Sequence, residues 1–296
     1  MTKTEKILLD KKRLLDIFIR HRIHSPFPGD WESNFKGLGY EFWSLRELIP
    51  GDPLCNIDWK ATAKTGRYYI REYLAESYFN VMILYDISAS VGFGRKELLQ
   101  AQVAVSIAYS AIIANNGCGL ILFADDIKGY LPPRMGNSHF REILNTIVKI
   151  KPYSCRTTKL QNALTKLVTE IPESLTFILS DFLYPLEFTY SFHRTVHGTT
   201  GHEVKAVQVL DAGEISLSDD SRGIIPLYDY ESGETILFDL SQWENYNQKI
   251  AEAQKKIKQR LERAGIDLVT ITPEDNFQQK INGFMKRPAF LDKMAG

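Results

Sequence analysis

The chain has 296 residues, of which 44% are hydrophobic and 24% are charged, a composition typical of a globular protein. Its 36 basic side chains balance its 36 acidic ones, so the net charge offers no case for binding nucleic acid or an anionic membrane surface. No window approaches the roughly 18 apolar residues that span a bilayer, no signal-peptide core is evident, and the three cysteines have no CxxC spacing. We therefore expect a cytoplasmic protein without a membrane span, and we take it to be a monomer.

The N-terminal part of the chain is predicted to form a helix followed by a small β-rich subdomain. Residues 5–22 place apolar side chains at helical spacing, and 24–30 (HSPFPGD) are rich in helix breakers, so 1–30 are assigned to a helix and linker. Residues 31–77 hold aromatic and β-branched residues between turn signals, which favours short strands and turns. A structural ion-pair network is favoured over a binding surface for the charged and aromatic residues of this subdomain: Arg46, Asp52, Asp58, Trp59, Arg67 and Arg71.

One apolar stretch is the centre of the predicted fold. Residues 81–85 form a continuous apolar run that is too short for a helix. Such a run predicts a strand of a parallel sheet that is buried on both faces. The strand ends at Asp86, and Ser88 and Ser90 follow at alternate positions. Three small oxygen ligands in a turning loop suit a hard cation such as Mg²⁺. Asp and Ser also occur in such loops as turn and cap residues, so the motif alone leaves a structural role open.

The elements that follow indicate an α/β protein with a doubly wound, mostly parallel sheet. We expect a buried helix over Lys96 to Ala114, a buried strand over Cys118 to Ala124, and a short edge strand over Ile127 to Leu131. Pro132 and Pro133 are expected to break the chain before the next helix, which covers His139 to Ile150.

Two further loops carry polar groups to the same edge of this sheet. Thr157 or Thr158 precedes a helical pattern that starts near Leu160, and either is a candidate N-cap. Leu175 to Asp181 is another buried strand, and it ends in a carboxylate. Because carboxyl ends of parallel strands meet at one edge, these groups are expected near Asp86.

The C-terminal third completes the predicted domain, which covers residues 78–290. A β-hairpin insertion is expected near residues 211–240. The other elements expected here are a strand, a charged helix ended by Gly265, a last strand and a closing helix: Glu203 to Leu210, Trp243 to Ala264, Ile266 to Thr272 and Phe277 to Lys286.

The succession of strand, DxSxS loop, threonine loop and strand ending in Ser-Asp resembles the von Willebrand factor type A fold with its metal-ion-dependent adhesion site. By this resemblance, one coordination position of the ion is open to a carboxylate of a partner, and the ion is Mg²⁺, Mn²⁺ or Ca²⁺. Thr157 is the second choice for the threonine. The positions that match the site are Asp86, Ser88, Ser90, Thr158 and Asp181.

Further segments resemble the bacterial domain-of-unknown-function-58 family. They are GLGYEF, LRELIPGD, NIDWKATAKTGRYYIREY, HEVKAVQVLDAGE, YDYESGE and AGIDLVTITPED, which together span roughly residues 35–287. The resemblance implies work with a MoxR-type AAA+ ATPase, or with an acidic client segment, in assembling, activating or remodelling other proteins. Two features depart from the family: membrane helices found in many members are missing, and Cys155-Arg156 replaces the usual Gly-Gly.

Other functional classes fit the sequence less well. A metal-assisted phosphohydrolase using Asp86 is the alternative, but the second Asp of a haloacid dehalogenase motif is replaced by Ser88, so we expect no enzyme activity. His193 and His197 lack the intervening Glu of a HExxH zinc site, and we interpret them as solvated or capping residues.

Overall fold

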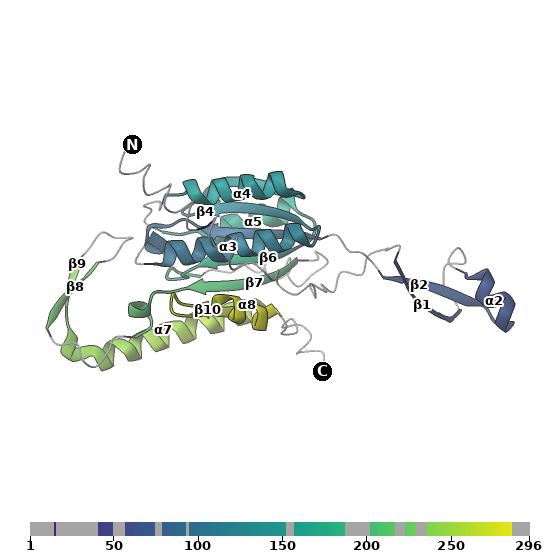
Figure 1. Cartoon of the computed structure of the whole chain (residues 1–296). Helices are drawn as coiled ribbons and strands as arrows, with labels where there is room; N and C mark the ends of the chain where they lie inside the picture. The colour runs from purple at the N-terminus through teal and green to yellow at the C-terminus, as the bar shows by residue number, and fades with distance from the viewer. Residues whose placement is uncertain are drawn as a thin grey trace. The chain divides into compact units, whose positions relative to one another are not determined.

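A computed structural model describes the chain as two compact units, and each is treated by itself: residues 1–31 with 80–296, and residues 32–79 (Figure 1). The predicted N-terminal helix falls outside the described residues except for Leu15, which is helical and buried. The linker at 24–30, Cys155-Arg156, His193 and His197 also lie outside them. The described residues are 15, 41–49, 57–74, 79–92, 95–151, 157–186, 202–216, 223–228 and 235–285.

A mixed, mostly parallel sheet is the centre of the larger unit. Within the described residues its strands run in the order β10-β7-β6-β3-β4-β5, and only the pair β4–β5 is antiparallel. This confirms the predicted doubly wound α/β class. The strands are β3 (Asn80–Asp86), β4 (Gly117–Phe123), β5 (Ile127–Arg134), β6 (Ser174–Ser180), β7 (His202–Val209) and β10 (Asp267–Ile271).

Helices cover both faces of this sheet (Figure 1). Helix α3 contacts β3, β4, β6 and β7 on one face and packs against α4. On the other face, α5 and α7 join one apolar cluster with side chains of β3, β4, β6 and β7. The helical elements of this unit are η2 (Ala89–Gly92), α3 (Lys96–Ile113), α4 (Asn137–Lys149), α5 (Leu160–Glu170), η3 (Ala212–Glu214), η4 (Leu240–Gln242), α7 (Trp243–Arg263) and α8 (Phe277–Met285).

The strand order creates a topological switch point between β3 and β6. From β3 the chain crosses to β4 on one side, and it later returns to β6 on the other side. Ligands of open α/β sheets bind beyond the carboxyl ends of strands at such a point. In the β3–β6 register Tyr85 lies beside Leu179, so Asp86 and Ser180 are the next neighbours.

Two local expectations were wrong. Pro132 and Pro133 lie inside β5, where no break occurs. Among the described strands β5 pairs with β4 alone, at the edge of the sheet, and an edge position tolerates a missing N–H. Neither Thr157 nor Thr158 caps α5, because that helix starts at Leu160 with Lys159 at the N-cap position, without a side-chain capping bond.

An antiparallel hairpin, β8 (Ile224–Tyr228) with β9 (Thr235–Asp239), follows the strand β7 along the chain and precedes α7. Leu237 and Ile224 are exposed on it. The structure therefore has a hairpin within the stretch where the sequence predicts one.

The smaller unit pairs two antiparallel strands, β1 (Glu41–Glu47) and β2 (Tyr69–Leu74), and also contains the helix α2 (Trp59–Thr65). This helix was not predicted. The Asp58 carboxylate caps it by accepting hydrogen bonds from the backbone N–H groups of Lys60 and Ala61, both at 2.9 Å. Gly66 ends the helix with φ 72°, a left-handed conformation that favours glycine.

Candidate functional site

Asp86 lies at the end of β3, and its carboxylate is fully buried. Its Oδ1 accepts a hydrogen bond from the backbone N–H of Ser88 at 2.8 Å, and its Oδ2 accepts one from Ser180 Oγ at 2.6 Å. Gln100, on α3, donates from Nε2 to the backbone carbonyl of Asp86 at 2.8 Å. The loop and β6 therefore hold the side chain in one orientation, and α3 holds the backbone of the same residue.

The two serines of the DxSxS loop lie side by side. The loop turns through the 3-10 helix η2, and this brings Ser88 Oγ and Ser90 Oγ to 3.1 Å from each other. Two neighbouring ligands of an octahedral Mg²⁺ ion are about 3.0 Å apart, because each lies about 2.1 Å from the metal. The separation of these hydroxyls therefore fits adjacent positions around such an ion.

Asp181 follows β6 directly and is fully buried beside Asp86 at the switch point. Its Oδ1 accepts a hydrogen bond from the backbone N–H of Leu183 at 3.2 Å. Gln208 of β7 donates from Nε2 to the Asp181 carbonyl at 2.9 Å and accepts a hydrogen bond from Thr270 Oγ1 at 3.0 Å. Strands β7 and β10 thus support the position of this second carboxylate.

A buried lysine that the sequence analysis did not select contacts the site. Lys96, the first residue of α3, has no exposed side-chain surface, and its Nζ lies 3.2 Å from Asp181 Oδ2 and 2.7 Å from Glu214 Oε1. Glu214 Oε2 in turn accepts a hydrogen bond from the backbone N–H of Asp211 at 2.9 Å, as part of a capping box in η3. Lys96 therefore links α3, the end of β6 and the segment after β7.

Thr158 lies in a loop that is attached to the same edge of the sheet. The backbone N–H of Lys159 donates to the carbonyl of Ala124, directly after β4, at 2.7 Å. Thr158 is 5% exposed, whereas Thr157 is exposed. The buried threonine is therefore the one that the loop turns toward the protein.

The electrostatic balance of the site favours a cation. Burial, followed by the negative charge of Asp181, raises the pKa of Asp86 to about 7, although hydrogen bonds from Ser180 and Ser88 act in the opposite direction. When ionised, the carboxylates of Asp86, Asp181 and Glu214 carry two more charges than the ammonium group of Lys96 neutralises. Buried charges require a counter-charge or a metal, so an ion of charge +2 would balance this group.

The donor set fits a hard divalent cation. The carboxylates and hydroxyls supply only oxygen atoms, and each carboxylate oxygen retains acceptor capacity beyond its one hydrogen bond or ion pair. Among the described residues no group of three His, Cys, Asp or Glu side chains is arranged to hold a metal, so this candidate depends on its hydroxyl ligands. The residues that would hold the ion are Asp86, Ser88, Ser90, Thr158 and Asp181.

The motif did not reveal the roles of two supporting residues. Ser180 precedes Asp181 in a strand, and Lys96 begins an apolar helix ten positions after Asp86. The signal in the sequence that could have revealed Lys96 is a charged residue at the start of a helix whose other side chains are apolar enough to predict burial.

Comparisons with known proteins define the family. Residues 44–260 match the family described as "Protein of unknown function DUF58", and the chain belongs to this family. The uncharacterized protein Rv1480 of Mycobacterium tuberculosis is 28% identical over 228 residues, covering 75% of this chain and 70% of that protein. The uncharacterized protein YeaD of Bacillus subtilis is 29% identical over 101 residues, covering 34% of this chain and 24% of that protein. The predicted family is confirmed.

Solved structures similar to this chain include von Willebrand factor type A domains. One from Catenulispora acidiphila has a TM-score of 0.43 and 10% identity, covering 73% of this chain and 43% of that chain. The SpRpn10 VWA domain has a TM-score of 0.38 and 12% identity, and the match covers 70% of this chain and 95% of that domain. An aerotolerance-related membrane protein from Bacteroides fragilis has a TM-score of 0.43 and 17% identity, and the match covers 70% of this chain and 98% of that chain. In this chain, none of the helices among the described residues has the length and apolar character needed to cross a bilayer.

Proposed function

We propose that this chain is a metal-dependent protein–protein interaction module. The observation that carries the proposal is the meeting of Asp86, Asp181 and the paired hydroxyls of Ser88 and Ser90 at the switch point of the sheet. Thr158 is the fifth proposed ligand. Mg²⁺ is the proposed ion, with Mn²⁺ and Ca²⁺ as substitutes, because all the donors are oxygen atoms.

The proposed partner contributes a carboxylate to the open coordination position of the ion. Lys96 already neutralises part of the charge of Asp181, which leaves the bound ion with more positive character toward an incoming ligand. A Glu or Asp side chain of the partner would then complete the coordination shell. This argument supports an acidic protein segment over a neutral one.

The proposed biological context follows from the family resemblance. We propose that the partner is a MoxR-type AAA+ ATPase or an acidic client segment, and that the pair assembles, activates or remodels other proteins. An ATPase partner needs ATP, so the proposed compartment is the bacterial cytoplasm. We propose that the chain acts as a monomer.

The proposed role of Asp86 is that of a ligand, and the chain is proposed to have no enzyme activity. A phosphohydrolase of the haloacid dehalogenase type uses a second Asp two positions after the nucleophile as its acid/base, and Ser88 occupies that position here. Both oxygens of the Asp86 carboxylate accept hydrogen bonds from the protein. These contacts support the interaction module over a phosphohydrolase.

Calorimetric titration with Mg²⁺ and Mn²⁺ tests this proposal directly. Asp86→Asn removes the charge while keeping an acceptor for Ser180, so it should weaken metal binding by at least about tenfold, equivalent to about 1.4 kcal/mol. The control Asp267→Asn removes a carboxylate at the start of β10. This position lies at the amino ends of the parallel strands, away from the carboxyl ends where Asp86 lies, so metal affinity should be unchanged. Equal metal affinities for wild type and Asp86→Asn would contradict the proposed site.

A pull-down with the MoxR-type ATPase from the same bacterium tests the partner. Capture by the wild-type chain should require Mg²⁺, should be lost in EDTA and should be reduced by Asp86→Asn. Capture that is unaffected by EDTA would contradict metal dependence, and no capture in Mg²⁺ would contradict the ATPase as partner.

A further inference from the structure

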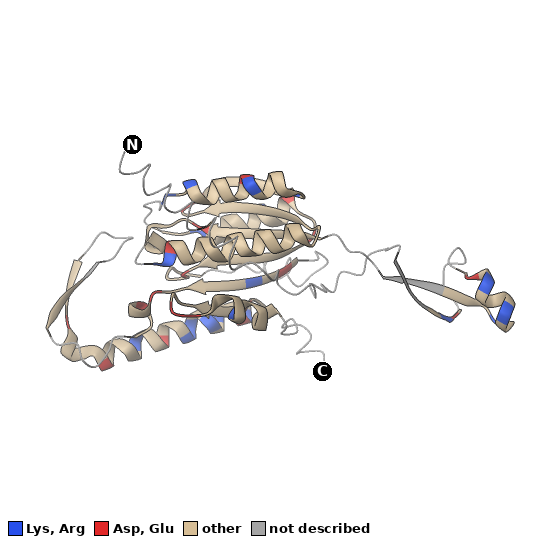
Figure 2. Cartoon of the chain, viewed as in Figure 1, with Lys and Arg blue, Asp and Glu red and all other residues tan. Residues whose placement is uncertain are grey.

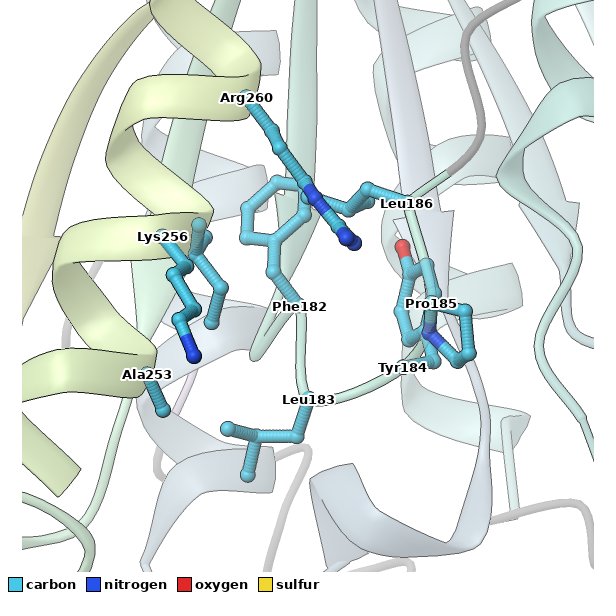
Figure 3. A pocket seen from close by; sticks show the side chains of 9 residues that line it. Phe182, Leu183, Tyr184, Pro185, Leu186, Ala253, Lys256 and Arg260 are labelled. Carbon is cyan, nitrogen blue, oxygen red and sulfur yellow. The ribbon is translucent and has the colours of Figure 1, made fainter. Parts of the chain in front are cut away.

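A groove lies between the segment that follows β6 and the helix α7 (Figure 3). We call it the β6–α7 groove, and its volume is about 310 Å³. The β6 side is residues 182–186, which follow Asp181 without interruption. The α7 side is Ala253, Lys256, Ile257 and Arg260.

The lining of the β6–α7 groove is mainly apolar. Phe182, Tyr184 and Leu186 are buried and belong to the apolar cluster beneath α5 and α7, so they form a firm base. Leu183 is 44% exposed, and Ile257 of α7 is half-buried. A volume of this size accommodates one or two bulky apolar side chains, and it lies at the lower end of the range found for ligand pockets.

Two basic side chains of the α7 wall line this apolar surface. Lys256 and Arg260 are exposed, one helical turn apart, and Figure 3 shows both extending beside the hollow. Neither side chain has a carboxylate within ion-pair distance among the residues that the structure describes. Along residues 253–263 of α7, five basic residues accompany a single acidic one, and Figure 2 shows this concentration of positive charge.

We propose that the β6–α7 groove binds an extended acidic segment of a protein partner. A bulky apolar side chain of the segment packs against Leu183 and Ile257, and neighbouring carboxylates pair with Lys256 and Arg260. The apolar lining excludes a purely electrostatic ligand, and the basic residues select against neutral or basic segments. This inference rests on the proposed function in one respect, that the ligand is a protein segment.

The groove and the candidate metal site share one short stretch of backbone. Leu183 lines the groove, and its N–H donates to Asp181 Oδ1 at 3.2 Å. The Tyr184 hydroxyl lies 3.3 Å from Ser180 Oγ, which donates to Asp86 Oδ2 at 2.6 Å. A segment in the groove therefore touches Leu183, which donates to Asp181, and Tyr184, whose hydroxyl contacts the serine that donates to Asp86.

The backbone of this shared stretch is also strained. Phe182 has φ 56°, a left-handed conformation that is uncommon for residues other than glycine, and its side chain is fully buried. A strained residue between a ligand-binding loop and a metal ligand is a place where the two can influence each other. Without the ion, the buried carboxylates carry excess negative charge beside the groove, so an acidic segment should bind more tightly when the ion is present, and linkage requires the segment to strengthen ion binding by the same factor.

Selection from a random twelve-residue peptide library displayed on phage, with the full chain as bait in Mg²⁺, tests the proposed ligand chemistry. Enriched sequences should carry a Leu, Ile, Met or Phe within a few positions of two or more acidic residues. Enrichment of basic or uncharged sequences, or no enrichment, would overturn the proposal.

Fluorescence anisotropy with an enriched synthetic peptide then locates its site. The double variant Lys256→Glu with Arg260→Glu should weaken binding by at least about tenfold, as should Leu183→Ser. The matched control Lys60→Glu with Lys64→Glu makes the same charge change one helical turn apart on α2, outside the groove lining, and should change affinity by less than about twofold. Equal losses in both double variants would show a non-specific charge effect and overturn the assignment to the groove.

The same peptide separates this inference from the proposed metal site. In EDTA the peptide should bind more weakly, by several-fold, yet binding should still depend on Lys256 and Arg260. If Asp86→Asn retains full metal affinity, the metal proposal fails while the groove result stands. If calorimetry finds metal at Asp86 but peptide binding ignores the groove variants, the groove proposal fails alone.

Discussion

The unfolding free energy of this protein should depend on pH through Asp86. In the folded protein the pKa of this carboxyl is raised from 3.8 to about 7, mainly by burial and then by the charge of Asp181. Between these values the folded state keeps a proton that the unfolded state releases. In metal-free buffer, the contribution of Asp86 to the unfolding free energy is therefore largest below about pH 4, and it falls as the pH rises toward 7.

The size of this effect follows from the shift. A change of one in the pKa is equivalent to about 1.4 kcal/mol, so the loss of unfolding free energy between about pH 4 and pH 7 amounts to roughly 4 kcal/mol. A bound divalent cation favours the ionised carboxylate and lowers this pKa, so Mg²⁺ should remove most of the loss. Free Mg²⁺ at a hundred times its dissociation constant would itself stabilise the folded state by about 2.7 kcal/mol.

Urea unfolding followed by circular dichroism, in EDTA and in Mg²⁺, measures both effects. Other groups titrate over the same range, so the informative quantity is the difference in slope between wild type and Asp86→Asn in EDTA. The wild type should lose more stability than the variant on going from about pH 5 to about pH 8. Parallel pH profiles for the two proteins would refute the assignment of the raised pKa to Asp86.

Two further changes test the packing around the site and the sheet. Lys96→Met should reduce the unfolding free energy in metal-free buffer by about 3–5 kcal/mol, because it leaves buried carboxylates without their counter-charge. In the control, Lys258→Met removes the exposed pair with Glu262 and should cost less than about 1 kcal/mol; similar losses in both would contradict a special role for the buried pair. Gly119→Ala should cost about 1–3 kcal/mol, because its Cβ would lie 2.9 Å from the backbone carbonyl of Leu131. Gly283→Ala, with open space on a helix, should instead add roughly 0.5–1 kcal/mol, and a loss there would contradict this account.

The candidate site combines residues that a local pattern exposes with residues that it does not. Asp86, Ser88 and Ser90 are close in the chain, so their spacing alone predicts a common loop. Asp181 was selected because it ends an apolar strand, and parallel strands bring such ends to one edge. Ser180 belongs to the Ser-Asp end of its strand, but the pattern assigns it no contact, and the β3–β6 register with its hydrogen bond shows that it donates to Asp86.

The errors in the predicted elements have local causes. The helix α2 was missed because aromatic and β-branched residues favour strands, whereas capping by Asp58 and the left-handed Gly66 favour a helix of that length. The sequence predicts a break at Pro132-Pro133 because proline disrupts most strands. Its tolerance depends on whether the strand lies at an edge of the sheet, which the residues of the strand do not encode.

The sequence by itself determined the α/β class, because uninterrupted apolar runs and helical periodicity are properties of neighbouring residues. It also determined the loop that presents Asp86. Tertiary structure alone decided that the ammonium group of Lys96 meets Asp181 and Glu214, which lie 85 and 118 positions away. It likewise decided that the segment after β6 forms a groove with α7. These contacts depend on the order in which strands assemble and on which helix covers which face, and no short-range pattern specifies either of them.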